Sequence, residues 1–149
     1  QHMILQGEDV TGAIRENAVS RYASQVSAYP EVRTFLLEMQ RDLARTHNVI
    51  MDGRDIGTVV LPQADLKIFL TASVEERARR RCAELAARGQ RVDLATVQAE
   101  IAQRDYDDTH RAAAPLRKAA DAVEVDTSRM DWEESLEALL TLVKERLSL

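Results

Sequence analysis

Cysteine is almost absent from this chain of 149 residues: Cys82 stands alone, which excludes an internal disulfide and fits a reducing cytoplasm. The three histidines, His2, His47 and His110, lack the spacing of metal ligands, so no metal site is expected. No apolar run approaches the length of a membrane span, and no signal-peptide pattern opens the sequence. A net charge of −5 argues against non-specific binding to nucleic acid. The composition is that of a soluble globular domain.

The most informative stretch is NVIMDGRDIGTVVLP, residues 48–62. Its apolar run at 49–51 ends in Asp52, Gly53, Arg54 and Asp55, which predicts a buried strand of a parallel sheet. Ligands of such sheets collect at the carboxyl ends of the strands. Arginine suits bidentate phosphate recognition, and glycine lets the backbone approach a ligand. A solvated turn with a surface ion pair is the alternative from this segment alone.

Strand and helix patterns alternate along the chain, which predicts an α/β fold with a parallel sheet. Strands are expected at 3–5, 49–51, 66–70 and 122–125. Helices are expected over about 11–28 with a break near Arg15, from Pro30, from Ser73 to near Gly89, from Asp93 to about Arg111, and from Asp131. The last helix carries a stripe predicted to be core, formed by Leu136, Leu139, Leu140, Val143 and Leu147.

Three polar sets have two readings each. Six arginines between residues 77 and 91 form either a solvated helix face or a polyphosphate site. Arg104, Asp108 and Arg111, at i, i+4 and i+7, form either a surface salt-bridge ladder or a face for a ribose and a phosphate. Ser24 and Arg33 flank a bend between two helices, where they either converge on one ligand or, in the simpler reading, Ser24 bonds back to its own helix and Arg33 is merely exposed.

The central segment resembles the (D/E)GRD(I/M)GT segment of the bacterial cytidylate kinase family. Further matches follow in the family's order along nearly the whole chain. They are Gly7-Glu8-Asp9-Val10, Ser24-Gln25-Val26 with Pro30 and Arg33, Lys67-Ile68-Phe69-Leu70, Arg104-Asp105, Asp108, Arg111, Ala114-Pro115-Leu116 and Val125-Asp126-Thr127-Ser128. The resemblance implies a P-loop nucleoside-monophosphate-kinase-like parallel sheet flanked by helices. It also implies a cytoplasmic kinase of pyrimidine metabolism that transfers a phosphoryl group from ATP, with Mg²⁺, to CMP or dCMP.

The chain departs from this family at the P-loop. Its five glycines, at 7, 12, 53, 57 and 89, form no G-x-x-x-x-G-K-[ST] motif. We therefore expect the C-terminal two-thirds of a cytidylate kinase, without the N-terminal strand and P-loop, inactive by itself. Residues 1–47 would be the remainder of the CMP-binding (acceptor) subdomain, and 48–149 the C-terminal part of the core kinase domain with an arginine-rich lid around 74–92. The intact protein is expected to be a monomer, and this chain could self-associate through a bare sheet edge.

The resemblance also implies a role for each matching residue. Ser24, Arg33 and Asp55 would read the cytosine ring, with Gly53 in the same acceptor site. Arg104 and Asp108 would hold the sugar, and Arg54 and Arg111 the α-phosphate. Asp52 would approach Mg²⁺ through water, Arg77, Arg80 and Arg81 would belong to the lid, and Thr127 and Ser128 would lie near adenine. A non-catalytic CMP-binding module and a kinase of another small acceptor remain alternatives, which titration with CMP, UMP, AMP and ATP separates.

Overall fold

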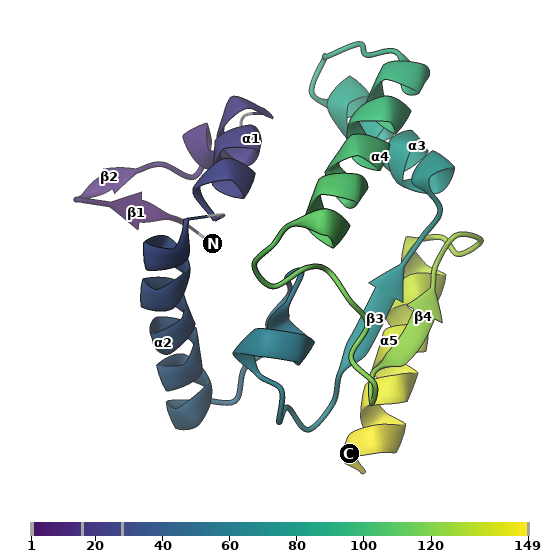
Figure 1. The fold of residues 1–149 in the computed structure, drawn as a ribbon. Coiled ribbons are helices and arrows are strands. Elements are labelled where there is room, and N and C mark those ends of the chain that lie inside the picture. The colour runs from purple at the N-terminus through teal and green to yellow at the C-terminus, as the bar shows by residue number, and fades with distance from the viewer. Residues whose placement is uncertain (1, 16, 28, 149) are drawn as a thin grey trace. The chain divides into compact units, whose positions relative to one another are not determined.

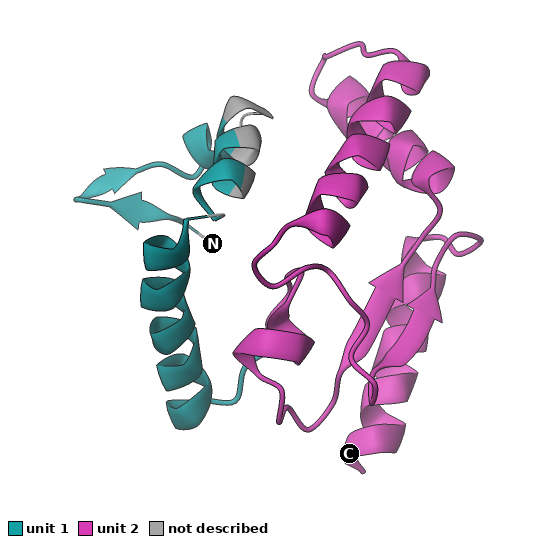
Figure 2. Ribbon diagram, viewed as in Figure 1, with its two compact units in different colours: residues 1–49 teal, residues 50–149 magenta. Residues whose placement is uncertain are grey.

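The computed structural model describes residues 2–15, 17–27 and 29–148, and Figure 1 shows its helices and strands. The chain divides into two compact units, residues 1–49 and residues 50–149 (Figure 2). The predicted α/β class is confirmed to this extent: the structure is mixed α/β, with a small parallel sheet in the second unit.

Unit 1 begins with a β-hairpin. Strand β1 (Ile4–Leu5) pairs antiparallel with β2 (Glu8–Asp9), with Ile4 opposite Asp9. Gln6 and Gly7 form the two-residue turn and both have positive φ, 51° and 88°. That combination matches the twist of a hairpin, and glycine adopts it without steric cost. The strand predicted at 3–5 is thus present as half of a local hairpin.

The helices of unit 1 follow their sequence signals. The 3₁₀ turn η1 (Ala13–Arg15) precedes α1 (Asn17–Val26), which confirms the break expected near Arg15. Helix α2 (Pro30–Thr46) has proline in its first turn, where the missing N–H costs nothing. None of the residues of α2 is buried, and Phe35 on its apolar face is 72% exposed.

Unit 2 contains a two-stranded parallel sheet. Strand β3 (Ile68–Thr71) pairs with β4 (Val123–Asp126), with Ile68 beside Val123 and Thr71 beside Asp126. Between them run α3 (Val74–Ala87) and α4 (Leu94–His110), which lie side by side beyond the carboxyl ends of the strands (Figure 1). Helix α5 (Trp132–Leu147) follows β4 and lies along the sheet (Figure 1). The strands predicted at 66–70 and 122–125 are confirmed.

Side-chain caps start the three helices of unit 2 as predicted. The Ser73 hydroxyl accepts from the Glu76 amide at 3.2 Å, and Asp93 accepts from the Thr96 amide at 2.9 Å. Asp131 and Glu134 form a reciprocal capping box, each side chain accepting from the other residue's amide, at 2.8 and 2.9 Å. The buried apolar side chains among the described residues are Val60, Ala72, Ala78, Leu85 and Val97.

Two expectations about the core are wrong. Residues 49–51 form no strand, and Ile50 is fully exposed. A strand requires a ladder partner, and within the described residues β3 and β4 pair with each other alone. The chain instead enters the π-helical turn η2 (Ile56–Val60).

The apolar stripe of α5 is the second error. Leu136, Leu140 and Leu147 are exposed, and Leu139 and Val143 are half-buried. A sheet of two strands is too narrow to cover the whole apolar face of a sixteen-residue helix.

Candidate functional site

The loop at residues 52–55 leads directly into η2. The Asp55 carbonyl accepts from the amides of Val59 and Val60 at 2.9 and 3.2 Å, so the residue fixes the turn through its backbone. A Cβ at Gly53 would lie 2.8 Å from Cγ1 of Ile56, closer than real contacts allow. Glycine at position 53 therefore lets the loop pack closely against η2. The Asp52 side chain is exposed.

Asp108 on α4 joins this loop to the helix. Nε of Arg54 donates to its Oδ2 at 2.8 Å, and Nε of Arg104 lies 3.9 Å from the same oxygen. The Asp108 side chain is 7% exposed, so its carboxylate is buried between two guanidinium groups. The i, i+4 spacing of Arg104 and Asp108 does place them on one face, as predicted.

Arg111 differs from its prediction as part of that helical face. Helix α4 ends at His110, and Arg111 is its C-cap with ψ of 142°, so the side chain leaves the helix. Its Nε donates to the Ala114 carbonyl at 2.8 Å, where the backbone turns through a φ of 49°. The loop after α4 therefore directs the guanidinium toward Asp55, with Nη2 3.8 Å from Oδ1 of Asp55.

Nη2 of Arg111 is buried without a hydrogen-bond partner among the described residues. Buried polar groups in native structures are nearly always paired, so such a nitrogen indicates a place for an additional acceptor. A guanidinium donates to two oxygens at once, which suits a carboxylate or a phosphate. Arg54, Asp55, Arg104, Asp108 and Arg111 thus converge in unit 2, and an anion is the ligand that the group could hold.

The predicted lid arginines are bonded to protein groups. Arg77 donates through Nη1 and Nη2 to the two carboxylate oxygens of Asp105 at 2.9 and 2.6 Å. Arg80 donates to Glu76 at 2.9 Å and to the Thr127 carbonyl at 2.7 Å. These contacts tie α3 to α4 and to the loop after β4, so the arginine cluster is more than a solvated face.

Arg81 pairs within α3, where it donates to Glu84 at 2.7 Å. This hydrogen bond lowers the pKa of Glu84 below its usual range. The contact between Arg81 and Glu84 lies inside α3.

Asp105 is the residue that the sequence interpretation left without a role. It stands beside Arg104 in one of the matched pairs, and it receives both donors of Arg77. The sequence offered one indication of a role for Asp105, because its carboxylate stands next to Arg104, the predicted sugar contact. Its partner was not predictable, because Arg77 lies on another helix.

Thr127 and Ser128 lie in the loop after β4, as expected. Thr127 is buried, and its amide donates to the Thr71 carbonyl at 2.8 Å. The Ser128 hydroxyl accepts from the Ser73 amide at 2.8 Å, which connects this loop to the start of α3. Ser128 also donates its hydroxyl and amide to Asp126, which holds the pKa of that carboxyl below its usual value.

The remaining two predicted residues, Ser24 and Arg33, belong to unit 1. The Ser24 side chain lies outside the described part of the structure. Nη1 of Arg33 donates to the Ser27 carbonyl at 3.3 Å, across the bend between α1 and α2.

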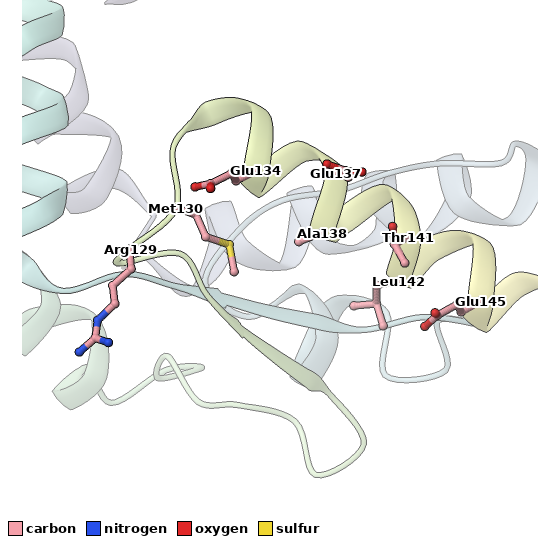
Figure 3. Close-up of a pocket in the computed structure, with 8 residues that line it drawn as sticks. All are labelled: Arg129, Met130, Glu134, Glu137, Ala138, Thr141, Leu142 and Glu145. Atoms are coloured by element: carbon pink, nitrogen blue, oxygen red, sulfur yellow. The ribbon is translucent and has the colours of Figure 1, made fainter.

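A separate groove runs along α5 (Figure 3). Glu134, Glu137 and Glu145 line it, and the Arg129 side chain points away from the helix in this view (Figure 3). None of the predicted site residues lines the groove. Three carboxylates along one helix disfavour a phosphate ligand, so this groove is not the candidate site.

Comparison with known proteins agrees along almost the full chain. A family model described as cytidylate kinase matches residues 1–145. The cytidylate kinase of Stutzerimonas stutzeri (strain A1501) is 53% identical over 144 residues, which are 97% of this chain and 63% of that protein. The cytidylate kinase of Geobacillus sp. (strain WCH70) is 50% identical over 147 residues, 99% of this chain and 66% of that protein.

A third relative gives the same picture. The cytidylate kinase of Streptococcus pneumoniae (strain Hungary19A-6) is 50% identical over 139 residues, 93% of this chain and 62% of that protein. The chain thus spans 62–66% of the length of these three relatives. The ordered motifs, the α/β fold and these matches agree, and the chain belongs to the cytidylate kinase family.

Proposed function

We propose that this chain carries the site for CMP or dCMP, the phosphoryl acceptor of an ATP-dependent kinase that forms CDP or dCDP. The observation that carries the proposal is the buried Nη2 of Arg111, which has no hydrogen-bond partner among the described residues and pairs with Asp55 at 3.8 Å, near a second guanidinium–carboxylate pair. Family membership supports a nucleoside monophosphate as the anion. The complete protein would have the P-loop nucleoside-monophosphate-kinase fold, with β3 and β4 as a two-stranded part of its parallel sheet.

The acceptor half of the site follows from the side chains present. Arg54 and Arg111 would bind the α-phosphate, and Arg104 and Asp108 the sugar. When Arg54 turns to the phosphate, the Asp108 carboxylate is released from its 2.8 Å hydrogen bond and can accept from ribose hydroxyls. Asp55 would accept from the cytosine amino group.

Ser24 and Arg33 would also read the cytosine ring, as the resemblance to the family implies. Gly53 would let the backbone of the loop approach the nucleotide.

The donor half is less complete in this chain. Thr127 and Ser128 would flank the adenine, and Arg80 and Arg81 would turn from their present partners to the transferring phosphate, whereas Arg77 would keep its contact with Asp105. Mg²⁺ would arrive on the ATP phosphates and keep several water ligands, with Asp52 reaching it through water. The ATP phosphates themselves are normally held by a P-loop, and the chain has no such motif. We therefore propose that the 149-residue chain binds CMP without turning it over.

Location and assembly follow the same proposal: a cytoplasmic enzyme, monomeric when intact. In the part of the chain that the structure describes, no helix is both long and apolar enough to cross a membrane.

Isothermal titration of this chain with CMP, UMP, AMP and ATP tests the proposal. We expect CMP to bind, UMP to bind more weakly, AMP not to bind and ATP to bind weakly. Equal affinity for AMP and CMP would favour a kinase of another acceptor. The binding-module alternative, favoured by the missing P-loop motif, would stand if CMP binds but no CDP forms even after fusion to the N-terminal segment of a relative.

A further inference from the structure

We propose that Arg77 is a positioning residue that holds α4 against the end of β3, and so places the sugar-binding pair Arg104 and Asp108. This inference rests on the proposed acceptor site. It assigns to Arg77 a role within the protein fold, in place of a direct contact with the transferring phosphate.

One guanidinium group connects three elements. Arg77 lies in the first turn of α3, and its Nε donates to the carbonyl of Ala72, the buried residue directly after β3, at 2.9 Å. Its Nη1 and Nη2 donate to the two oxygens of Asp105 on α4 at 2.9 and 2.6 Å. A planar guanidinium with two parallel bonds fixes direction as well as distance. These bonds therefore fix the position of α4 relative to the carboxyl end of β3.

The position of Asp105 within α4 connects this contact to the site. Asp105 is next to Arg104 and one turn before Asp108, whose buried carboxylate meets Arg54. Because a helix is rigid over one turn, a shift at Asp105 moves Arg104 and Asp108 with it. Arg77 therefore acts on the nucleotide through α4.

The present contacts also disfavour Arg77 as a phosphate ligand. To reach a phosphate, its guanidinium would have to leave the bidentate pair and the Ala72 carbonyl, and the Asp105 carboxylate, 34% exposed, would lose both donors. Arg79 provides a contrast on the same helix. It pairs with Glu75 and Glu76 of α3 itself, and its side chain is 60% exposed.

The first experiment measures CMP and cytidine binding to the 149-residue chain by isothermal titration. The variants are Arg77→Ala, Asp105→Ala and the double variant, with Arg79→Ala and Asp107→Ala as matched controls. We expect each single variant to weaken both ligands by roughly fivefold, and the double variant to lose no more than either, because both changes break one contact. Both controls should bind like the unaltered chain.

Other results would overturn the inference. A phosphate ligand at Arg77 predicts that Arg77→Ala spares cytidine and that Asp105→Ala has no effect. Additive losses in the double variant would likewise show that the two side chains act separately. Arg77→Lys keeps the charge and one donor direction, so it should recover part of the affinity for both ligands.

Hydrogen exchange of the ligand-free chain gives a second test that needs no nucleotide. The amides of α4 should exchange faster in Arg77→Ala and Asp105→Ala to the same extent, while those of β3 and β4 keep their rates and show that the fold persists. Unchanged α4 exchange in both variants would overturn the inference. Failure of the unaltered chain to bind CMP would overturn the proposed function instead, and exchange would still decide whether Arg77 holds α4. Arg77→Lys and Asp105→Asn repeat both measurements should an alanine variant not fold.

Discussion

Arg111→Lys is the sharpest test of the acceptor site. Arginine places Nε on the Ala114 carbonyl and holds a buried Nη2 3.8 Å from Oδ1 of Asp55, with no hydrogen-bond partner among the described residues. Lysine keeps the charge, but a single ammonium cannot bond the carbonyl and present a two-pronged donor to a phosphate. We expect the variant to bind CMP more weakly and cytidine almost normally, because cytidine has no phosphate.

The magnitude follows from the bonds at stake. One charge-assisted hydrogen bond to a phosphate oxygen contributes about 1.5–3 kcal/mol, so CMP affinity should fall by roughly 10- to 100-fold. Loss of the Ala114 contact is a separate term of about 1 kcal/mol in the free energy of unfolding. Loss of the Ala114 contact should change the affinity for CMP and the affinity for cytidine equally. Its effect on stability can be measured separately by denaturant unfolding of the ligand-free chain.

The assay is isothermal titration of both ligands, with Arg117→Lys as the control because that arginine is exposed and lies six residues further along. A selective loss for CMP supports the phosphate role of Arg111. Equal losses for CMP and cytidine would refute the reasoning, since the arginine would then be acting on the fold. A loss of CMP affinity of the same size in Arg117→Lys would show that the effect is not specific to Arg111.

Four further results are expected. Asp55→Asn should reduce the preference for CMP over UMP, which in the unaltered chain should amount to about 1–3 kcal/mol by titration, because uracil presents a carbonyl to a carboxylate. Asp131→Ala removes the bond that the Asp131 side chain accepts from the Glu134 amide at the start of α5 and should lower the free energy of unfolding by about 1 kcal/mol in urea, whereas Glu133→Ala should not. The Lys67 hydrogen bond lowers the pKa of Asp121 below its ordinary 3.8, so this contact stabilises the fold fully above pH 3.8 and is lost as the pH falls further. In thermal unfolding, Asp121→Asn should therefore reduce the loss of stability at acidic pH. The purified chain should form no CDP from ATP and CMP, and robust turnover abolished by Asp55→Ala would contradict the donor-side account.

Local signals predicted the helices well. Ser73, Asp93 and Asp131 each start a helix through a hydrogen bond to an amide three residues on, a contact contained within the local sequence. Pro30 likewise marks the first turn of α2. Such boundaries depend on neighbours in sequence and not on the rest of the fold.

The two errors in the core have a non-local origin. Residues 49–51 have the composition of a strand, yet a strand forms on a partner, and their composition carries no information about whether one is present. The α5 stripe has the spacing of a buried face, but the area available to cover it is set by the number of strands beside it. In a wider sheet, residues 49–51 could pair as a strand and the apolar stripe of α5 could be buried.

The site shows the same division. The sequence placed Arg104 and Asp108 on one helical face, because that spacing is local. It did not predict that Arg54, far from Asp108 in sequence, would donate to its carboxylate, or that Asp105 would receive Arg77. Those pairs depend on how loop 52–55, α3 and α4 pack together.

The acceptor and donor halves of the proposed site therefore depend on different parts of the fold. The residues proposed to bind the acceptor phosphate are held together by contacts inside unit 2. Arg54 and Asp55 in one loop contact Asp108 and Arg111 at the end of α4. None of these contacts uses a ladder bond from residues 49–51, so the absence of that strand leaves them intact. Donor binding, in contrast, requires backbone N–H groups and a lysine that a P-loop supplies, and no rearrangement of the present side chains creates them. A chain with this sequence should therefore still bind the acceptor phosphate, whereas phosphoryl transfer to that phosphate requires a P-loop.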